Sequence, residues 1–146
     1  MNRTRRGRPS ARKGYVFFYG TLLPRLAPPE IEPTVRKLRR VGPGFIRGQL
    51  FDLGDYPGAI LTRSGPPIKG LVFEIPDAPE ILERLDEFEG FDPSNPESSL
   101  FVRKRRHAQL ENGRRVFCWV YAYNGPLKEA RALGGGDYTR ARAHRT

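Results

Sequence analysis

The strongest constraint on the fold is a pair of apolar strands in the second half of the chain. Residues 100–110 and 114–123 are strand-like runs joined by Glu-Asn-Gly at 111–113, a connection that predicts a β-hairpin. Alternate residues of a strand face opposite ways, and the second run is apolar on both faces. One face carries Phe117, Trp119, Tyr121 and Tyr123, and the other carries Cys118, Val120 and Ala122. We therefore expect a central strand covered on both sides, as in a small barrel.

The other predicted elements are short. With 16 glycines and 14 prolines in 146 residues, the composition favours turns over long helices. Further strands are expected near residues 15–19, 44–54, 59–61 and 68–75, with turns at 64–67 and at 55–58, the latter centred on Pro57-Gly58. A short basic helix is expected within 33–38, with Pro33 in its first turn. The fold class is α+β: a small mixed, mostly antiparallel β-barrel with one or two packed helices, in one domain over residues 14–142, followed by a tail at 143–146.

The clearest helix lies between residues 77 and 90. Asp77 is a candidate N-cap with Glu80 as its capping-box partner, and Gly90 is a typical C-terminal stop. The apolar residues at helical spacing are Ile81, Leu82, Leu85 and Phe88. This stripe predicts a helix packed on the barrel by one face.

Net charge separates a basic arm from the rest of the chain. The formal charge is +10, and residues 1–13 contribute +6 of it with no acidic residue. We expect this arm, rich in arginine, glycine, proline and serine, to be disordered. Such an arm can bind nucleic acid through phosphates, or it can be a solvated tail without a defined role.

Other features bear on compartment and cofactors. No apolar run approaches the length of a membrane span, and no apolar segment of a secretory signal follows the charged N-terminus. The single Cys118 suggests a buried, unreactive thiol in a reducing cytoplasm. His107 and His144 are isolated and no Cys/His ligand spacing occurs, so no metal and no cofactor is expected.

Two stretches are candidates for chemistry. Residues 16–22 read as a strand that ends at Gly20, where a turn can present backbone N–H groups to an anion or oxyanion, or can simply reverse the chain. Among the acids of the helix, Glu83, Asp86 and Glu87 are expected to be solvated. Glu89 follows Leu85 by four residues, at the edge of the buried face and at the helix end that disfavours a carboxylate. Its pKa should therefore be raised, as in general acid/base carboxylates, although a structural role fits the spacing too.

Four blocks in order resemble the gamma-glutamylcyclotransferase-like (AIG2-like) family. They are Tyr-Gly-Thr-Leu at 19–22, Gly-Gln-Leu-Phe-Asp-Leu-Gly-Asp-Tyr-Pro-Gly at 48–58, Leu-Asp-Glu-Phe-Glu-Gly at 85–90 and Ser-Leu-Phe-Val-Arg at 99–103. Gly-Asp-Tyr at 136–138 resembles the tail of the family. The resemblance implies a barrel with a substrate cavity at its mouth, no cofactor, and Glu89 as the acid/base residue. The candidate substrate-binding residues are Tyr19, Gly20, Thr21, Leu22, Tyr56, Phe101, Arg103 and Tyr121.

The resemblance implies a cytoplasmic cyclotransferase that releases 5-oxoproline from a γ-glutamyl amine or peptide. Arg103 could hold a carboxylate or orient Glu89, and Tyr121 could line the pocket or pack in the core. Phe101 stands where the family often has tyrosine, so a hydroxyl contact to substrate or to Glu89 is missing. The alternative is a non-catalytic small-molecule-binding barrel whose arm, residues 1–13, docks nucleic acid or acidic partners. A third possibility is that the pocket takes another small amide or an acylated intermediate.

Overall fold

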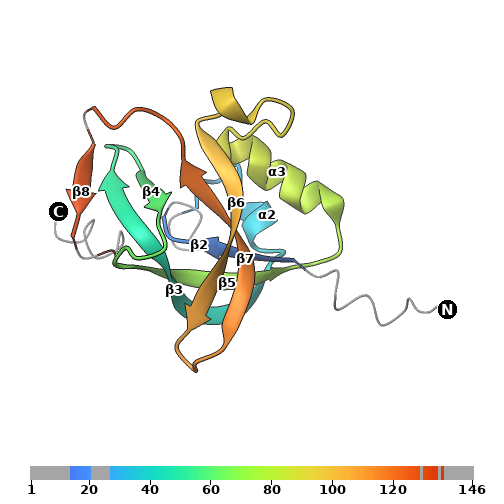
Figure 1. The fold of residues 1–146 in the computed structure, drawn as a ribbon. Coiled ribbons are helices and arrows are strands. Elements are labelled where there is room, and N and C mark those ends of the chain that lie inside the picture. Colours follow the sequence, from blue (N-terminus) through green and yellow to red (C-terminus); the bar gives the residue numbers. More distant parts are fainter. Residues whose placement is uncertain (1–13, 21–26, 129, 135, 137–146) are drawn as a thin grey trace.

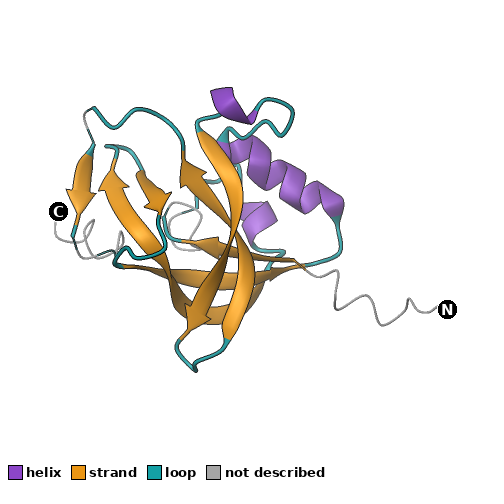
Figure 2. Ribbon diagram, viewed as in Figure 1, coloured by secondary structure: helices purple, strands orange, loops and turns teal. Residues whose placement is uncertain are grey.

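The structure is a five-stranded barrel with two helices packed on one side. It is a computed structural model, and it describes residues 14–20, 27–128, 130–134 and 136. In the described residues the strands are β2 (Gly14–Phe18), β3 (Arg39–Asp52), β4 (Pro57–Leu61), β5 (Pro67–Ile75), β6 (Phe101–Leu110), β7 (Arg115–Tyr123) and β8 (Arg131–Leu133). The helices are α2 (Glu32–Val35) and α3 (Pro79–Glu89), with a short 3-10 turn at Pro96–Ser98. Figure 2 shows both helices on the same side of the barrel.

The barrel closes through the long strand β3. The strands pair in the order β3-β5-β2-β7-β6, and β6 returns to pair with β3 at Gly44 and Phe45. All of these pairings are antiparallel except β2 with β7. From Gly48 onward, β3 leaves the barrel and pairs with β4 and β8 instead. The predicted mixed, mostly antiparallel barrel is confirmed, and so is the hairpin of β6 and β7.

The apolar run of β2 is explained by two separate cores. Val16 and Phe18 pack with the helices in a cluster that contains Ile81 and Leu85. Phe17, one residue out of phase, belongs to a second cluster inside the barrel. A strand buried on both faces needs an uninterrupted apolar sequence, and this is what residues 16–18 supply.

Strand β7 matches the prediction over only part of its length. It lies between β2 and β6, and Cys118 and Val120 point into the barrel core. The outer face is covered from Trp119 to Tyr123, where those residues pack against the helical cluster. Phe117 is 48% exposed, so the expectation of cover on both sides is wrong at this end. Burial raises the pKa of the Cys118 thiol to about 12, which leaves it protonated and unreactive.

One predicted helix cap and one predicted turn differ from the structure. Helix α3 has Ala78 as its N-cap, with no side-chain capping bond, so the Asp77–Glu80 capping box is wrong. Pro79 occupies the first helical turn, where its fixed φ and missing N–H suit the helix start. The turn expected around Pro57 is also displaced. It falls at 53–56, and Pro57 begins β4, a strand position that tolerates a residue without an N–H.

Candidate active site

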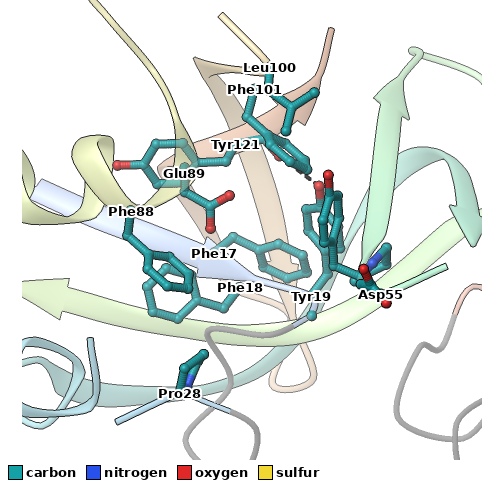
Figure 3. Close-up of a pocket in the computed structure, with 13 residues that line it drawn as sticks. Phe17, Phe18, Tyr19, Pro28, Asp55, Phe88, Glu89, Leu100, Phe101 and Tyr121 are labelled. Atoms are coloured by element: carbon teal, nitrogen blue, oxygen red, sulfur yellow. Dashed lines mark hydrogen bonds between the residues drawn. The ribbon is translucent and has the colours of Figure 1, made fainter. Parts of the chain in front are cut away.

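The barrel has a cavity of about 290 Å³ at the end of β2, beside the C-terminal end of α3. Its walls are mainly apolar and aromatic, with few polar groups, as in many small-molecule sites. Figure 3 shows the lining side chains. The described residues that line it are Phe17, Phe18, Tyr19, Gly20, Pro28, Asp55, Tyr56, Pro57, Phe88, Glu89, Leu100, Phe101 and Tyr121.

Glu89 points into this cavity from the last residue of α3. The helix ends because Gly90 adopts a left-handed conformation, with φ of 73°, which glycine reaches without strain. Although Glu89 is only half-buried as a residue, its carboxyl group lies above the rings of Phe17 and Phe18 in Figure 3. Burial in these surroundings raises the pKa of Glu89 from 4.5 to about 8. A carboxyl group with a pKa close to neutrality can both accept and donate a proton.

Tyr19 is held by two hydrogen bonds within the fold. Its hydroxyl donates to the Tyr121 carbonyl oxygen at 2.7 Å and accepts from the Ala59 N–H at 3.1 Å. Burial, with a smaller contribution from the charge of Glu89, raises the pKa of Tyr19 above its ordinary value. The hydroxyl therefore joins β4 to β7, while the residue forms part of the cavity wall.

Gly20 allows a close approach between the end of β2 and the start of β4. A Cβ atom built on Gly20 would lie 2.4 Å from Cγ of Pro57, which is well inside van der Waals contact. Both residues line the cavity, so the missing side chain shapes its wall. Thr21 and Leu22, the other residues of this predicted turn, lie outside the described residues.

Replacing Gly20 by alanine should strain this wall. Because the proline ring cannot swing away, we expect the free energy of unfolding to fall by about 1–3 kcal/mol. Gly134→Ala is a matched control, since a Cβ there meets nothing within 4 Å. The measurement is urea denaturation of both variants and the wild type. Equal stability of the two variants would show that Gly20 and Pro57 do not pack closely.

Behind the cavity, Asp86 joins helix α3 to the barrel. Its carboxylate accepts hydrogen bonds from Arg103, with Nε to Oδ1 at 2.8 Å and Nη2 to Oδ2 at 3.0 Å. It also accepts a hydrogen bond from the Tyr121 hydroxyl at 2.6 Å. Asp86 is 7% exposed, so the prediction that it is solvated is wrong. The strands of the barrel bring two polar partners against this turn of the helix, and together they make its burial possible.

Arg103 has a different position from the one expected of a substrate-binding residue. It is absent from the described cavity lining, and its guanidinium lies over Trp119, 4.3 Å from the ring centroid, and 5.4 Å from that of Phe91. Its carboxylate partner is Asp86 rather than Glu89. Arg103 therefore lies behind Tyr121: it binds the Asp86 carboxylate, and the same carboxylate accepts the hydrogen bond of the Tyr121 hydroxyl. Direct contact of Arg103 with a substrate stays a prediction.

The remaining candidates lie together. Tyr56 and Phe101 both line the cavity, with ring centroids 5.9 Å apart, and the Tyr121 side chain closes the side nearest α3. The charge of Glu89 contributes to the raised pKa of Tyr121, after burial and the bond to Asp86. In the described part of the chain no group of His, Cys, Asp and Glu side chains is arranged to hold a metal ion. No helix among the described residues is long and apolar enough to cross a membrane.

Sequence reasoning missed several residues of the site. The sequence pattern predicts Phe88 in the packed stripe of the helix and Phe17 and Phe18 in a strand core, yet all three also line the cavity. Asp55 precedes Tyr56 and lies at the cavity, which its position in the 48–58 block could have suggested.

This fold and site define a class of small closed barrels that carry an acidic side chain in a cavity at the mouth. A family model described as gamma-glutamyl cyclotransferase, AIG2-like, matches residues 16–140. The chain therefore belongs to the AIG2-like gamma-glutamyl cyclotransferase family. No curated protein sequence matches the chain significantly.

Solved structures share the fold at low sequence identity. An AIG2-like protein from Mus musculus is 22% identical, with a TM-score of 0.61 over 78% of this chain and 80% of that one. Protein ytfP from Escherichia coli is 23% identical, with a TM-score of 0.59 over 88% and 98% of the two chains. A structure described as gamma-glutamyl cyclotransferase is 15% identical, with a TM-score of 0.57 over 77% and 67%. At these identities the likenesses establish the fold alone.

Proposed function

We propose that the chain is a cyclotransferase that releases 5-oxoproline from a γ-glutamyl amine or peptide, with Glu89 as general acid and base. Family membership supports a cyclotransferase-type reaction. The observation that carries the proposal is the position of Glu89: one carboxyl group with a pKa raised to about 8 projects into a mostly apolar cavity that it shares with Gly20. A single carboxyl group of this kind can serve both proton transfers of the reaction.

The reaction is an internal displacement. The α-amine nitrogen of the γ-glutamyl group attacks its own γ-carbonyl carbon, and a five-membered ring forms. The bond from that carbon to the departing nitrogen then breaks. The substrate ammonium first loses one proton to solvent, which frees the lone pair of the attacking nitrogen. Ionised Glu89 takes a second proton from this nitrogen as the ring forms and gives it to the departing nitrogen. That nitrogen leaves as a neutral amine and takes up a proton from solvent, so the carboxyl group ends as it began. No nucleophile of the protein is consumed in this scheme.

The cavity walls hold the reacting amine and carbonyl carbon of the substrate close together. An extended substrate does not cyclise, so the site must hold the amine close to the carbonyl carbon. The apolar rings of Phe17, Phe18 and Phe101 confine the substrate, and Asp55, together with Glu89 once it is ionised, attracts its ammonium group. We assign stabilisation of the developing oxyanion to the backbone N–H of Gly20, which lines the cavity.

The test is a substrate screen read out as 5-oxoproline. Purified protein is incubated with γ-glutamyl dipeptides, glutathione and γ-glutamyl polyamines, and 5-oxoproline is measured by mass spectrometry. We expect release from at least one γ-glutamyl compound and none from the matching α-glutamyl compound, whose amine cannot reach the scissile carbonyl to form this ring. Absence of 5-oxoproline from every γ-glutamyl compound would contradict the proposal.

A further inference from the structure

A second cavity, remote from Glu89, has a different chemical character. It has a volume of about 710 Å³, and its lining comes from β3, the end of β4, β6 and β7. It shares no described lining residue with the cavity of Glu89. We call it the basic groove. Its described lining is Phe45, Ile46, Arg47, Leu61, Thr62, Arg63, Arg105, Arg106, His107, Gln109, Arg115 and Phe117.

The basic groove forms because two strands diverge. Strand β6 pairs with β3 only at Leu110 and Gln109, close to its end. Towards Arg105 and Arg106 the two strands are no longer paired, and side chains line the space between them. The groove is therefore lined mainly by strands, and Thr62 and Arg63 come from the turn that follows β4.

Charge in the basic groove is of one sign. Five of its described lining residues are arginines, and none is an aspartate or glutamate. Ion pairs between described residues engage arginines outside the groove: Arg36, Arg39, Arg84, Arg103 and Arg131. A concave surface with clustered arginines attracts polyanions and binds phosphate groups.

Aromatic rings stand among these arginines. Phe117 is 48% exposed, the highest value among the exposed large hydrophobic residues of the described chain. The ring of His107 lies 4.8 Å from it across the β6–β7 pair, and the guanidinium of Arg105 lies 5.6 Å from it. On the opposite wall, Arg47 lies 5.2 Å over the ring of Phe45. Phe117 is thus exposed and Phe45 is half-buried. Accessible rings beside guanidinium groups can stack unpaired bases while the arginines contact the phosphates.

We propose that the basic groove binds single-stranded nucleic acid. Phosphates along the strand contact the arginines, and bases stack on Phe117 and Phe45. A duplex would satisfy the charges but would keep its base faces inside, so the exposed rings favour a single strand. This inference is independent of the chemistry at Glu89, because the two cavities have no described residue in common.

The test measures fluorescence anisotropy of a labelled single-stranded RNA of about 12 nucleotides with the full-length protein. Phe117→Leu keeps an apolar side chain but removes the ring, and should weaken binding about fivefold or more. The double variant R63Q/R115Q removes one charge from each side of the groove. For each phosphate that is no longer neutralised by an arginine, the slope of log affinity against log salt should fall by about 0.7.

Matched controls lie outside the groove. Leu127→Ala alters another exposed hydrophobic residue, 41% exposed, and K37Q/K128Q removes two exposed charges. Neither should change the affinity by more than about twofold, given the short range of screened surface charges. All variants should release 5-oxoproline at the wild-type rate, if the proposed function holds, and should keep the wild-type circular dichroism spectrum.

Several results would overturn the proposal. One is that the wild type does not bind RNA at low salt. Another is that the groove variants and the control variants weaken binding equally, which would mean that RNA is attracted by the net charge of the protein and not by the basic groove. Equal affinity for a duplex of the same length would remove the role of base stacking. Equal affinity for a poly-glutamate peptide would instead identify an acidic protein as the partner.

Discussion

Glu89→Gln is expected to lower the rate of 5-oxoproline release by a factor of about 10² to 10⁴, the usual contribution of a positioned general acid or base. Glutamine has nearly the same shape but can neither take nor return the proton. Substrate affinity should change much less than the rate, because the cavity walls remain. The measurement is kcat and KM with the best substrate of the screen, and Glu87→Gln, an exposed neighbour on the same helix, is the control.

The pH dependence of the same pair of proteins provides a second measurement. Activity of the wild type should rise with pH as Glu89 ionises, with an apparent pKa near 8. The small residual activity of Glu89→Gln should lack this rise. Wild-type activity that is already maximal near pH 5 would contradict a buried base at this position, and full activity in the variant would remove Glu89 from the mechanism.

As the pH rises, the free energy of unfolding of the wild type should fall while its activity increases. Folded Glu89 holds its proton up to about pH 8, whereas a glutamate in the unfolded chain loses it near pH 4.5. Between these values the folded state binds more protons, so the free energy of unfolding of the wild type falls as the pH rises. Glu89→Gln has no carboxyl group at this position, so its free energy of unfolding does not fall with pH for this reason. The variant should therefore be more stable at pH 8, on the order of 3 kcal/mol, and about as stable as the wild type at pH 4.5 and below, as measured by urea denaturation at both pH values.

Periodicity explains which parts of the fold could be predicted from the sequence. The apolar alternation of β7, the turn before it and the stripe on α3 are local patterns, and local patterns fix the type of an element. Two apolar faces on one strand require cover on both sides, and a barrel with a helix against it provides this for β2. Element ends were less predictable: β3 begins at Arg39, five residues before the predicted start, because it borders β5 along that stretch.

Contacts between segments far apart in the chain could not be predicted from the sequence. Asp86 looked like a solvated helix residue, and Arg103 like a residue that holds Glu89 or a substrate carboxylate. Their pairing depends on how α3 packs beside β6, and neither residue type nor spacing encodes that packing. The basic groove is a similar case, because its arginines come from four segments that meet only when the barrel closes. Glu89 could be predicted as a candidate from the sequence, because its place on the helix and the family resemblance both indicate this side chain.

The second large effect is expected from Asp86→Ala. Asp86 and Arg103 are both largely buried, with side chains 10% and 15% exposed, and each supplies the other's countercharge. Removal of the carboxylate leaves the Arg103 guanidinium without its partner and the Tyr121 hydroxyl without its acceptor. Loss of one partner of a buried pair costs about 3–5 kcal/mol. We expect a loss of this size in urea denaturation at pH 7.

Glu87→Ala is the matched control for this prediction. Glu87 is the next residue on α3, and it pairs with Arg84 at 2.9 Å, but those side chains are 71% and 53% exposed. An exposed pair contributes about 0–1 kcal/mol, so Glu87→Ala should be close to the wild type in stability. Because Asp86 fixes Tyr121 at the cavity wall, Asp86→Ala should also raise KM in the fraction that stays folded. If the two variants unfold at the same urea concentration, Asp86 does not join α3 to the barrel.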